Sequence, residues 1–265
     1  ALAASGLECG GSRSFAGGAD APLTVGGSNY LWLAVASTAT EGESAGSSER
    51  LFTRARWERR GIYGLGVDAE VAHVGAGFQP SLGFLARRNH LRTTGSLGWG
   101  WRMEEGSFLL RQRLSAGFQG YRRYGDGALE SGEVTPAWYL ETPGGHNLTV
   151  TGALRHEDLV RGFSIAPELT IPEGRYRYGS GRIAYSPSSS WPLRLSANAE
   201  VGSFYDGSLV SASLTPTWNA SRHLEMSGTW PVNRIAFPER DQERTTPGGR
   251  GRPGGMPNTH LSRVA

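Results

Sequence analysis

The stretch from Trp191 to Trp218 contains two long runs in which apolar and polar residues alternate. Side chains on a β-strand repeat every two residues, so each run would form a strand with one apolar and one polar face. Between the runs lies Phe204-Tyr205-Asp206-Gly207, whose Asp-Gly pair suits the positive backbone angles of a two-residue turn. The apolar positions are Leu193, Leu195, Ala197, Ala199, Val201, Tyr205, Val210, Ala212, Leu214, Pro216 and Trp218, with Ser203 as the one polar residue on the same face.

The length of these runs constrains the fold further. Strands in globular proteins average about 5–6 residues. Each run here exceeds the roughly 9–11 residues that a tilted strand needs to cross a bilayer. Alternation of outward apolar and inward polar residues over such a length is typical of a transmembrane β-barrel. The hairpin is therefore predicted to cross a membrane.

Similar runs recur along most of the chain, at residues 50–59, 62–74, 91–102, 107–123, 129–141, 147–154, 175–185 and 223–230. A weak strand is expected near 7–15, and 29–37 is apolar on both faces, so its facing is not predicted. Segments 155–174 and 241–258 are expected to be irregular or loop. Short polar turns leave no room for crossover helices.

The predicted fold is all-β, an antiparallel up-and-down transmembrane β-barrel with about 11–13 strands. We expect residues 1–265 to form one β-barrel domain, because closure removes the open edges of a wide sheet. Pro136 and Pro216 lie inside predicted strands and each removes a hydrogen-bond donor. We therefore expect each at a strand end, a bulge or an open edge.

The two ends of the chain indicate a piece of a larger barrel protein. Residues 1–5 lack the charged start and apolar core of a signal peptide, and residues 261–265 read as the start of a strand. We expect that an N-terminal module and the closing C-terminal strands are absent.

Composition excludes several classes of function. No window approaches 18 apolar residues, so no transmembrane helix is expected. The 27 basic residues are all arginine, are scattered, and leave a net charge of only +3, which does not predict a nucleic-acid surface. Cys9 is the only cysteine, and the six histidines lack metal-ligand spacing, so neither a metal site nor a cofactor is expected.

The strand pattern assigns side chains to two surfaces. Two tryptophans near one end of the 91–102 strand suit an interfacial aromatic girdle. The predicted lipid-facing residues are Leu91, Leu97, Trp99, Trp101, Phe108, Leu114, Trp138, Leu195, Leu214 and Trp218. The predicted lumen-facing residues are Arg54, Arg56, Glu58, Asp68, Glu70, Arg92, Arg111, Arg113, Glu133, Arg194 and Glu200.

The lumen-facing arginines have two interpretations. They could form a wall that favours anions. Alternatively, they could be interior packing, paired across strands with the nearly equal number of acidic residues. The second interpretation is favoured because acids and bases are almost balanced.

A barrel-embedded hydrolase is also kept open. His156-Glu157-Asp158 and Ser164 supply the residue types of such an enzyme. No Gly-x-Ser-x-Gly elbow is present and nothing orients a base towards a nucleophile, so no catalytic residue is assigned.

Several strings resemble one bacterial family of uncharacterised proteins. They are Phe204-Tyr205-Asp206-Gly207, Ile171-Pro172-Glu173-Gly174-Arg175-Tyr176, the segment from Phe78 to Phe84, and the acidic segment Glu157-Asp158-Leu159. The resemblance runs over most of residues 30–238. They resemble the C-terminal region of proteins that often begin with a module similar to family-nine carbohydrate-binding modules. This region is a domain of unknown function that looks like an outer-membrane barrel, with no established catalytic residue.

The sequence thus leads to one expected function and two alternatives. The first is a bacterial outer-membrane barrel, with the lipid bilayer as partner, acting as a pore or as an anchor for a carbohydrate-binding-like domain. Glycans would be partners only through that absent module. The alternatives are a soluble, lectin-like all-β protein and the hydrolase. A barrel would expose the predicted lipid-facing residues, whereas a sandwich would bury them together.

Overall fold

The computed structural model describes residues 2–9, 12–42, 45–80, 85, 87–166, 169–237, 242–247 and 259–263. The chain divides into two compact units. Unit 1 comprises Ala1–Trp99 and Gly117–Glu133, and unit 2 comprises Gly100–Ala116 and Val134–Ala265. The described residues form strands and turns and no helix. The fold is all-β, as the sequence predicts.

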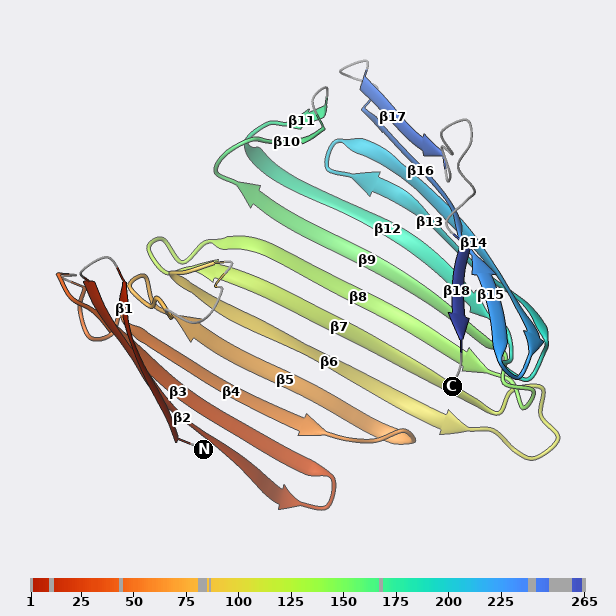
Figure 1. Cartoon of the computed structure of the whole chain (residues 1–265), viewed down its shortest axis with the longest axis horizontal. Coiled ribbons are helices and arrows are strands. Elements are labelled where there is room, and N and C mark those ends of the chain that lie inside the picture. The colour runs from red at the N-terminus through yellow and green to blue at the C-terminus, as the bar shows by residue number, and fades with distance from the viewer. Residues whose placement is uncertain are drawn as a thin grey trace. The chain divides into compact units, whose positions relative to one another are not determined.

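Strands follow one another along the chain in each unit (Figure 1). Unit 1 contains β1 (Leu2–Cys9), β2 (Ser12–Gly26), β3 (Asn29–Thr40), β4 (Leu51–Arg59) and β5 (Gly64–Val74). Both units share β6 (His90–Arg102), β7 (Arg111–Arg123) and β8 (Leu129–Glu141). Unit 2 contains β9 (Asn147–Leu159), β12 (Gly174–Ser186), β13 (Leu193–Phe204), β14 (Gly207–Ser221), β15 (Leu224–Gly228), β16 (Trp230–Phe237), β17 (Gln242–Pro247) and β18 (Thr259–Arg263). A separate hairpin consists of β10 (Phe163–Ala166) and β11 (Leu169–Ile171).

The main sheet has 16 strands and the up-and-down antiparallel topology predicted from the sequence. Its order follows the chain from β1 to β9 and then through β12, β13 and β14, with β15 to β18 beyond. No pairing among the described residues joins the first strand to the last, so the sheet is not closed and a barrel is not confirmed.

The number of strands exceeds the 11–13 expected, because additional strands form in segments where apolar and polar residues do not clearly alternate. The weak strand expected at 7–15 is wrong, since β1 ends at Cys9 and β2 begins at Ser12. The irregular segment 155–174 instead extends β9 to Leu159 and adds the β10–β11 hairpin. The loop expected at 241–258 contains β17, and the rest of it lies outside the described residues.

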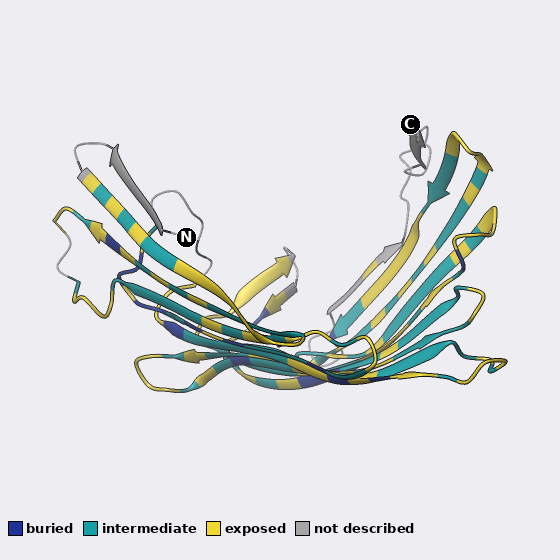
Figure 2. Cartoon of the chain, turned by 90° about the horizontal axis from the view of Figure 1, so that it is seen from below, coloured by how far each residue is buried: buried dark blue, intermediate teal, exposed yellow. Residues whose placement is uncertain are grey.

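Across β9, β12, β13, β14 and β16 of unit 2, the register places rows of mainly polar residues on one face and rows of mainly apolar residues on the other. Exposed and half-buried residues accordingly alternate along many strands (Figure 2). We call these the polar face and the apolar face. One apolar row is Val150, Ile183, Ala199, Ala212 and Val232, each opposite the next. The neighbouring polar row is Thr151, Arg182, Glu200, Ser211 and Asn233.

The same division holds in unit 1 across β3, β4 and β5. Trp32, Arg56 and Glu70 lie opposite one another on the polar face. Leu31, Trp57 and Ala69 form the adjacent row on the apolar face. The register with β4 therefore settles the facing of β3, which its own sequence does not.

The predicted β13–β14 hairpin is confirmed, with pairing from Leu193↔Trp218 to Phe204↔Gly207. The predicted turn chemistry is wrong. The two loop residues are Tyr205 and Asp206, and the positive φ of 54° belongs to Tyr205. A left-handed backbone costs a residue with a side chain about 1–2 kcal/mol, so contacts of the Tyr205 ring must offset this cost.

Pro216 explains why β15 and β16 are separate. Both pair with the same edge of β14 in one register, from Trp218↔Met226 to Ser208↔Ala236. The pairing is interrupted only where Pro216 and Thr215 face Gly228 and Thr229, because proline has no N–H to donate. Pro136 differs from expectation. It lies inside β8, which has a neighbour on each side, and it packs over Gly152, where an added Cβ would lie 3.2 Å from the Pro136 ring.

A glycine on the polar face of β13 is predicted to be required for strand packing. A Cβ added at Gly202 would lie 2.3 Å from the carbonyl oxygen of Gly179 and 2.5 Å from Cα of Ser180. We expect Gly202→Ala to lower the free energy of unfolding by about 1–3 kcal/mol, because the neighbouring backbone must move. Urea unfolding followed by tryptophan fluorescence measures this change.

Gly181 on β12 is the matched control, since an added Cβ there meets nothing within 4 Å. Gly181→Ala should leave the unfolding midpoint unchanged or raise it slightly. Equal losses in both variants would contradict the packing account.

Candidate functional site

A ladder of ion pairs crosses the polar face of unit 1. Glu70 on β5 accepts a hydrogen bond from Nε of Arg54 at 2.7 Å and another from Arg92 on β6. Its side chain is only 6% exposed. Arg56 donates to Asp68 through Nε at 2.8 Å. The ladder therefore brings together five predicted lumen-facing residues from three strands.

The pairing in this ladder is diagonal. Arg56 lies directly opposite Glu70 in the register, yet its guanidinium bonds to Asp68, while Arg54 bonds to Glu70. Diagonal neighbours on a sheet lie about 7–8 Å apart, within reach of long side chains. Each arginine is thereby held by a carboxylate, which is the pairing that the interior-packing interpretation expects.

The polar face of unit 2 carries further charged contacts. Arg111 donates to Glu141, and the Tyr139 hydroxyl donates to the same carboxylate at 2.8 Å. Arg194 bonds to Glu225 at 2.8 Å. Glu200 accepts from the Ser180 hydroxyl at 2.7 Å. Arg113 of unit 2 and Glu133 of unit 1 each have an interaction as well. Glu58 bonds to Arg60, in unit 1.

Aromatic rings interrupt the polar face of unit 1. Tyr30 and Trp32, two residues apart on β3, stack with centroids 5.8 Å apart. The Arg60 guanidinium lies 4.6 Å from the Tyr30 ring centroid, and Arg56 lies 5.4 Å from that of Trp32. A cavity of about 510 Å³ opens beside them. It is lined by Asp20, Trp32, Leu33, Ala34, Arg54, Arg56, Glu58 and Arg60.

The structure leaves nine of the ten predicted lipid-facing residues exposed. Their exposed fractions run from 39% for Trp101 to 83% for Phe108. Leu91 differs and is half-buried. Phe108 lies before β7 in the β6–β7 connection and not on a strand as predicted. Exposure is what lipid contact requires, and lipid contact itself stays a prediction. The other exposed members are Leu97, Trp99, Leu114, Trp138, Leu195, Leu214 and Trp218.

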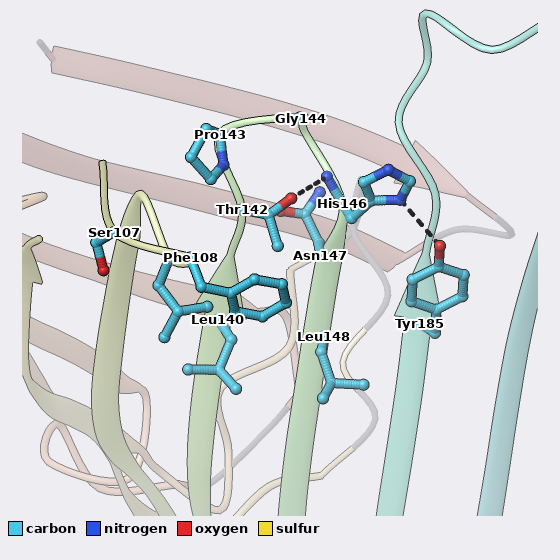
Figure 3. Close-up of a pocket in the computed structure, with 11 residues that line it drawn as sticks. Ser107, Phe108, Leu140, Thr142, Pro143, Gly144, His146, Asn147, Leu148 and Tyr185 are labelled. Atoms are coloured by element: carbon cyan, nitrogen blue, oxygen red, sulfur yellow. Dashed lines mark hydrogen bonds between the residues drawn. The ribbon is translucent and has the colours of Figure 1, made fainter. Parts of the chain in front are cut away.

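A second cavity, of about 680 Å³, lies at the β8–β9 turn of unit 2 (Figure 3). Leu140, Leu148 and Phe108 contribute apolar side chains to its lining. The Pro143-Gly144-Gly145 turn carries polar groups, and there Thr142 Oγ1 accepts from the His146 amide at 3.1 Å. The cavity is thus apolar towards the strands and polar towards the turn.

Aromatic groups surround the turn side of this cavity. His146 Nδ1 and the Tyr185 hydroxyl are 2.9 Å apart and hydrogen-bonded. The Trp191 and His146 rings pack in a T-shaped arrangement, with their centroids 4.7 Å apart. Side chains with an apolar body and a polar tip favour a boundary between apolar and aqueous surroundings.

An aromatic cluster forms at the opposite ends of the unit 2 strands. The Tyr205 ring lies 5.1 Å from Tyr176 and 4.9 Å from Tyr178, between centroids. Beneath it, Ile171 of β11 and Phe237 of β16 are buried. These contacts offset the strain of the Tyr205 backbone. Burial raises the pKa of the Tyr205 hydroxyl above its usual range.

The structure does not bring the hydrolase candidates together. His156 and Glu157 are adjacent on β9, so their side chains project to opposite faces. Asp158 lies 3.4 Å from Nε of Arg175 in an ion pair, and Ser164 on β10 is hydrogen-bonded to Thr170 at 2.9 Å. In the part of the chain that is described, no three His, Cys, Asp or Glu side chains cluster closely enough to hold a metal ion.

No protein-family model, curated protein or solved structure matches this chain. The resemblance to the carbohydrate-binding-associated family therefore stays a prediction. The described ranges contain no helix long and apolar enough to cross a membrane.

Sequence reasoning missed several members of these sites. Glu141 and Glu225 hold Arg111 and Arg194. Alternation places both carboxylates on the polar faces of their strands, but neither is among the predicted lumen-facing residues. Glu141 sits in alternation with Glu133 on β8, so the two-residue period was sufficient to find it. The Tyr30–Trp32 pair gave no such signal, because β3 is apolar on both faces.

Removal of the Glu70 charge is predicted to destabilise the sheet. In Glu70→Gln, Arg54 and Arg92 lose their shared counterion in a site where little water reaches the carboxylate. We expect the free energy of unfolding to fall by about 1–3 kcal/mol. Urea titration of the refolded chain measures it.

Asp126 supplies the matched control, in the exposed β7–β8 turn. The Ala128 amide and then Arg123 hold the pKa of its carboxyl below the usual value. Because water screens this exposed pair, Asp126→Asn should leave the unfolding midpoint unchanged. A Glu70→Gln variant as stable as the parent would show that the ladder is not required for folding.

Proposed function

We propose that this chain forms membrane-spanning β-structure of a bacterial outer-membrane protein and anchors that protein in the bilayer. Its apolar face contacts lipid, and its polar face turns towards the protein interior. The observation that carries the proposal is the exposed apolar face of β13 and β14. Leu193, Leu195 and Val201 on β13 are 64%, 49% and 58% exposed. Val210, Leu214 and Trp218 on β14 are 49%, 49% and 51% exposed.

Water is a poor solvent for such a face. Continuous apolar patches on soluble monomers rarely exceed a few hundred Å². Two neighbouring rows of the apolar face of unit 2 run across β9, β12, β13, β14 and β16, one from Val150 to Val232 and one from Leu148 to Trp230. Arg234 lies beside them on the same face, opposite Val210. Lipid tails would cover the two rows at no desolvation cost. The strands are long enough for this, since β13 has 12 residues and β14 has 15, against about 9–11 for a tilted span.

The backbone chemistry supports the same proposal. In hydrocarbon, an unpaired N–H or C=O costs several kcal/mol, so spanning strands must be paired along both edges. Central strands such as β13 are paired on both sides, with β12 and β14. The terminal strands would need closure or a partner before they could lie in lipid.

Aromatic residues mark one end of the strands in unit 2. The up-and-down topology brings the β6–β7, β8–β9 and β12–β13 connections to the same end. Trp101, Phe108, Tyr185, Trp191 and Trp218 lie close to these connections or to the β14–β15 turn, and all are exposed. Aromatic girdles of this kind lie at the headgroup level of outer-membrane proteins.

The paired charges favour an anchor over an anion-selective pore. Arg54, Arg56, Arg92, Arg111 and Arg194 each bond to a carboxylate. A wall whose charges cancel locally exerts little net field on a passing ion. The polar face therefore suits interior packing and hydrogen bonding.

The lectin-like alternative requires the predicted lipid-facing residues to share a buried interior. Within each unit, the described members of that set are instead exposed or, for Leu91, half-buried. The largest fully buried side chains among the described residues are Ile171 and Phe237, in the small cluster beneath Tyr205. This arrangement supports the membrane proposal.

A charge placed on the apolar face tests the proposal directly. Leu214→Arg puts a guanidinium where lipid is expected, which costs about 2–4 kcal/mol near the bilayer midplane. We expect this variant to lose insertion into lipid vesicles. Insertion is measured by co-flotation and by the gel mobility difference between unheated and heated samples.

Ser213→Arg is the control, one residue away on the polar face. Its side chain would project towards polar groups such as Asn198, which bonds to Ser213 at 3.1 Å. This variant should insert like the parent. Equal insertion of Leu214→Arg and the parent would contradict lipid contact at this face.

A further inference from the structure

Two aromatic rings on the polar face of unit 1 have no role in the membrane proposal. Tyr30 and Trp32 lie opposite Glu58 and Arg56 of β4, on the face that carries the ion-pair ladder. Contact with lipid does not explain why these two rings lie on the polar face, because in the membrane proposal only the apolar face of the same strands meets lipid. Two side chains at i and i+2 share one face of a strand. The two rings stack on each other at an interplanar angle of 30°, and the Arg60 and Arg56 guanidinium groups lie over the Tyr30 and Trp32 rings.

The cavity lined by Trp32 has the size of a small-molecule site. Its volume of about 510 Å³ lies within the range of about 300–1,000 Å³ typical of ligand pockets. Trp32 forms the aromatic wall, and the remaining lining is mainly charged, with Asp20, Arg54, Arg56 and Glu58 among the members. The indole of Trp32 thus adjoins several strong hydrogen-bonding groups in the cavity.

The charges around the cavity cancel. Arg60 is bonded to Glu58 at 2.9 Å, Arg56 to Asp68 at 2.8 Å, and Arg54 shares Glu70 with Arg92. With Asp20, four carboxylates face four guanidinium groups. An anion or a cation would meet repulsion as well as attraction here. A hydrocarbon would leave these groups without water or partners.

A neutral, hydroxyl-rich ligand with one apolar face satisfies all of these conditions. Its hydroxyls can donate to the carboxylates and accept from the guanidinium groups. Charge-assisted hydrogen bonds of this kind are stronger than neutral ones. Its C–H groups carry partial positive charge and pack on the negative face of an indole ring. Pyranose sugars have this chemistry.

We propose that the cavity beside Trp32 binds a neutral oligosaccharide, with one sugar ring packed against the part of the Trp32 indole that lines the cavity. Arg56 and Glu58 bond to its hydroxyls, and their ion pairs with Asp68 and Arg60 hold them in position. The site lies within unit 1 and does not depend on whether the apolar face meets lipid.

Isothermal titration of the refolded full chain in detergent micelles tests this site. Maltotriose, cellotriose and chitotriose are the probes, at concentrations up to about 10 mM, and inorganic phosphate is the charged comparison. At least one trisaccharide should bind more tightly than phosphate. Trp32→Ala should weaken that affinity by about five- to tenfold, the size of a lost stacking contact. Trp32→Phe should restore part of it.

Trp57→Ala is the matched control, because Trp57 lies on the adjacent strand but on the apolar face. It should leave the affinity unchanged. Failure of every trisaccharide to bind, tighter binding of phosphate, or equal losses in Trp32→Ala and Trp57→Ala would overturn the proposal. Urea midpoints of the variants show whether each is folded.

The outcomes separate this site from the membrane proposal. A chain that binds a trisaccharide but does not insert into vesicles would retain the site and lose the anchor. A chain that inserts but binds none of the probes would overturn the site alone.

Discussion

The antiparallel hydrogen-bond ladder is the constraint on which the rest of the structure depends. It fixes each strand against the next, and because side chains alternate, one register decides the facing of a whole strand. The row from Val150 through Ile183 to Ala212 continues across strands only while this register holds. A slip of one residue would send the arginines to the apolar face. Separation of charge from hydrocarbon is therefore a property of the ladder.

The ion-pair ladder and the register support each other. Glu70 can reach both Arg54 and Arg92 only when β4, β5 and β6 are correctly aligned. Each polar contact therefore penalises the wrong alignment and contributes to specificity as well as stability. The sheet tolerates a local interruption of strand pairing at Pro216, since β14 pairs in the same register with β15 on one side of this residue and with β16 on the other.

How far the sequence predicts this structure depends on the contrast between neighbouring residues. The strands around Trp138 and Leu195 were located well because large apolar and polar side chains alternate there. β1 and β2 were missed because their alanine, glycine and serine residues differ little in hydropathy. The positive φ of Tyr205 was not predictable, since it depends on ring contacts with residues of β12 and β13. The two-residue period predicts which face carries the charged residues, but not the diagonal ion pairs that form between strands on that face.

Lipid contact by alternate residues is the central claim, and spin-label accessibility measures it most directly. With Cys9 replaced by serine, a nitroxide is placed at each position of β13 and β14 in turn, in vesicles. The account predicts that labels at Leu195 and Leu214 collide with dissolved oxygen and avoid a water-soluble nickel complex, with the pattern reversing at Ser196 and Ser213. Access that does not alternate with a period of two, or nickel access at Leu195 and Leu214, would contradict it.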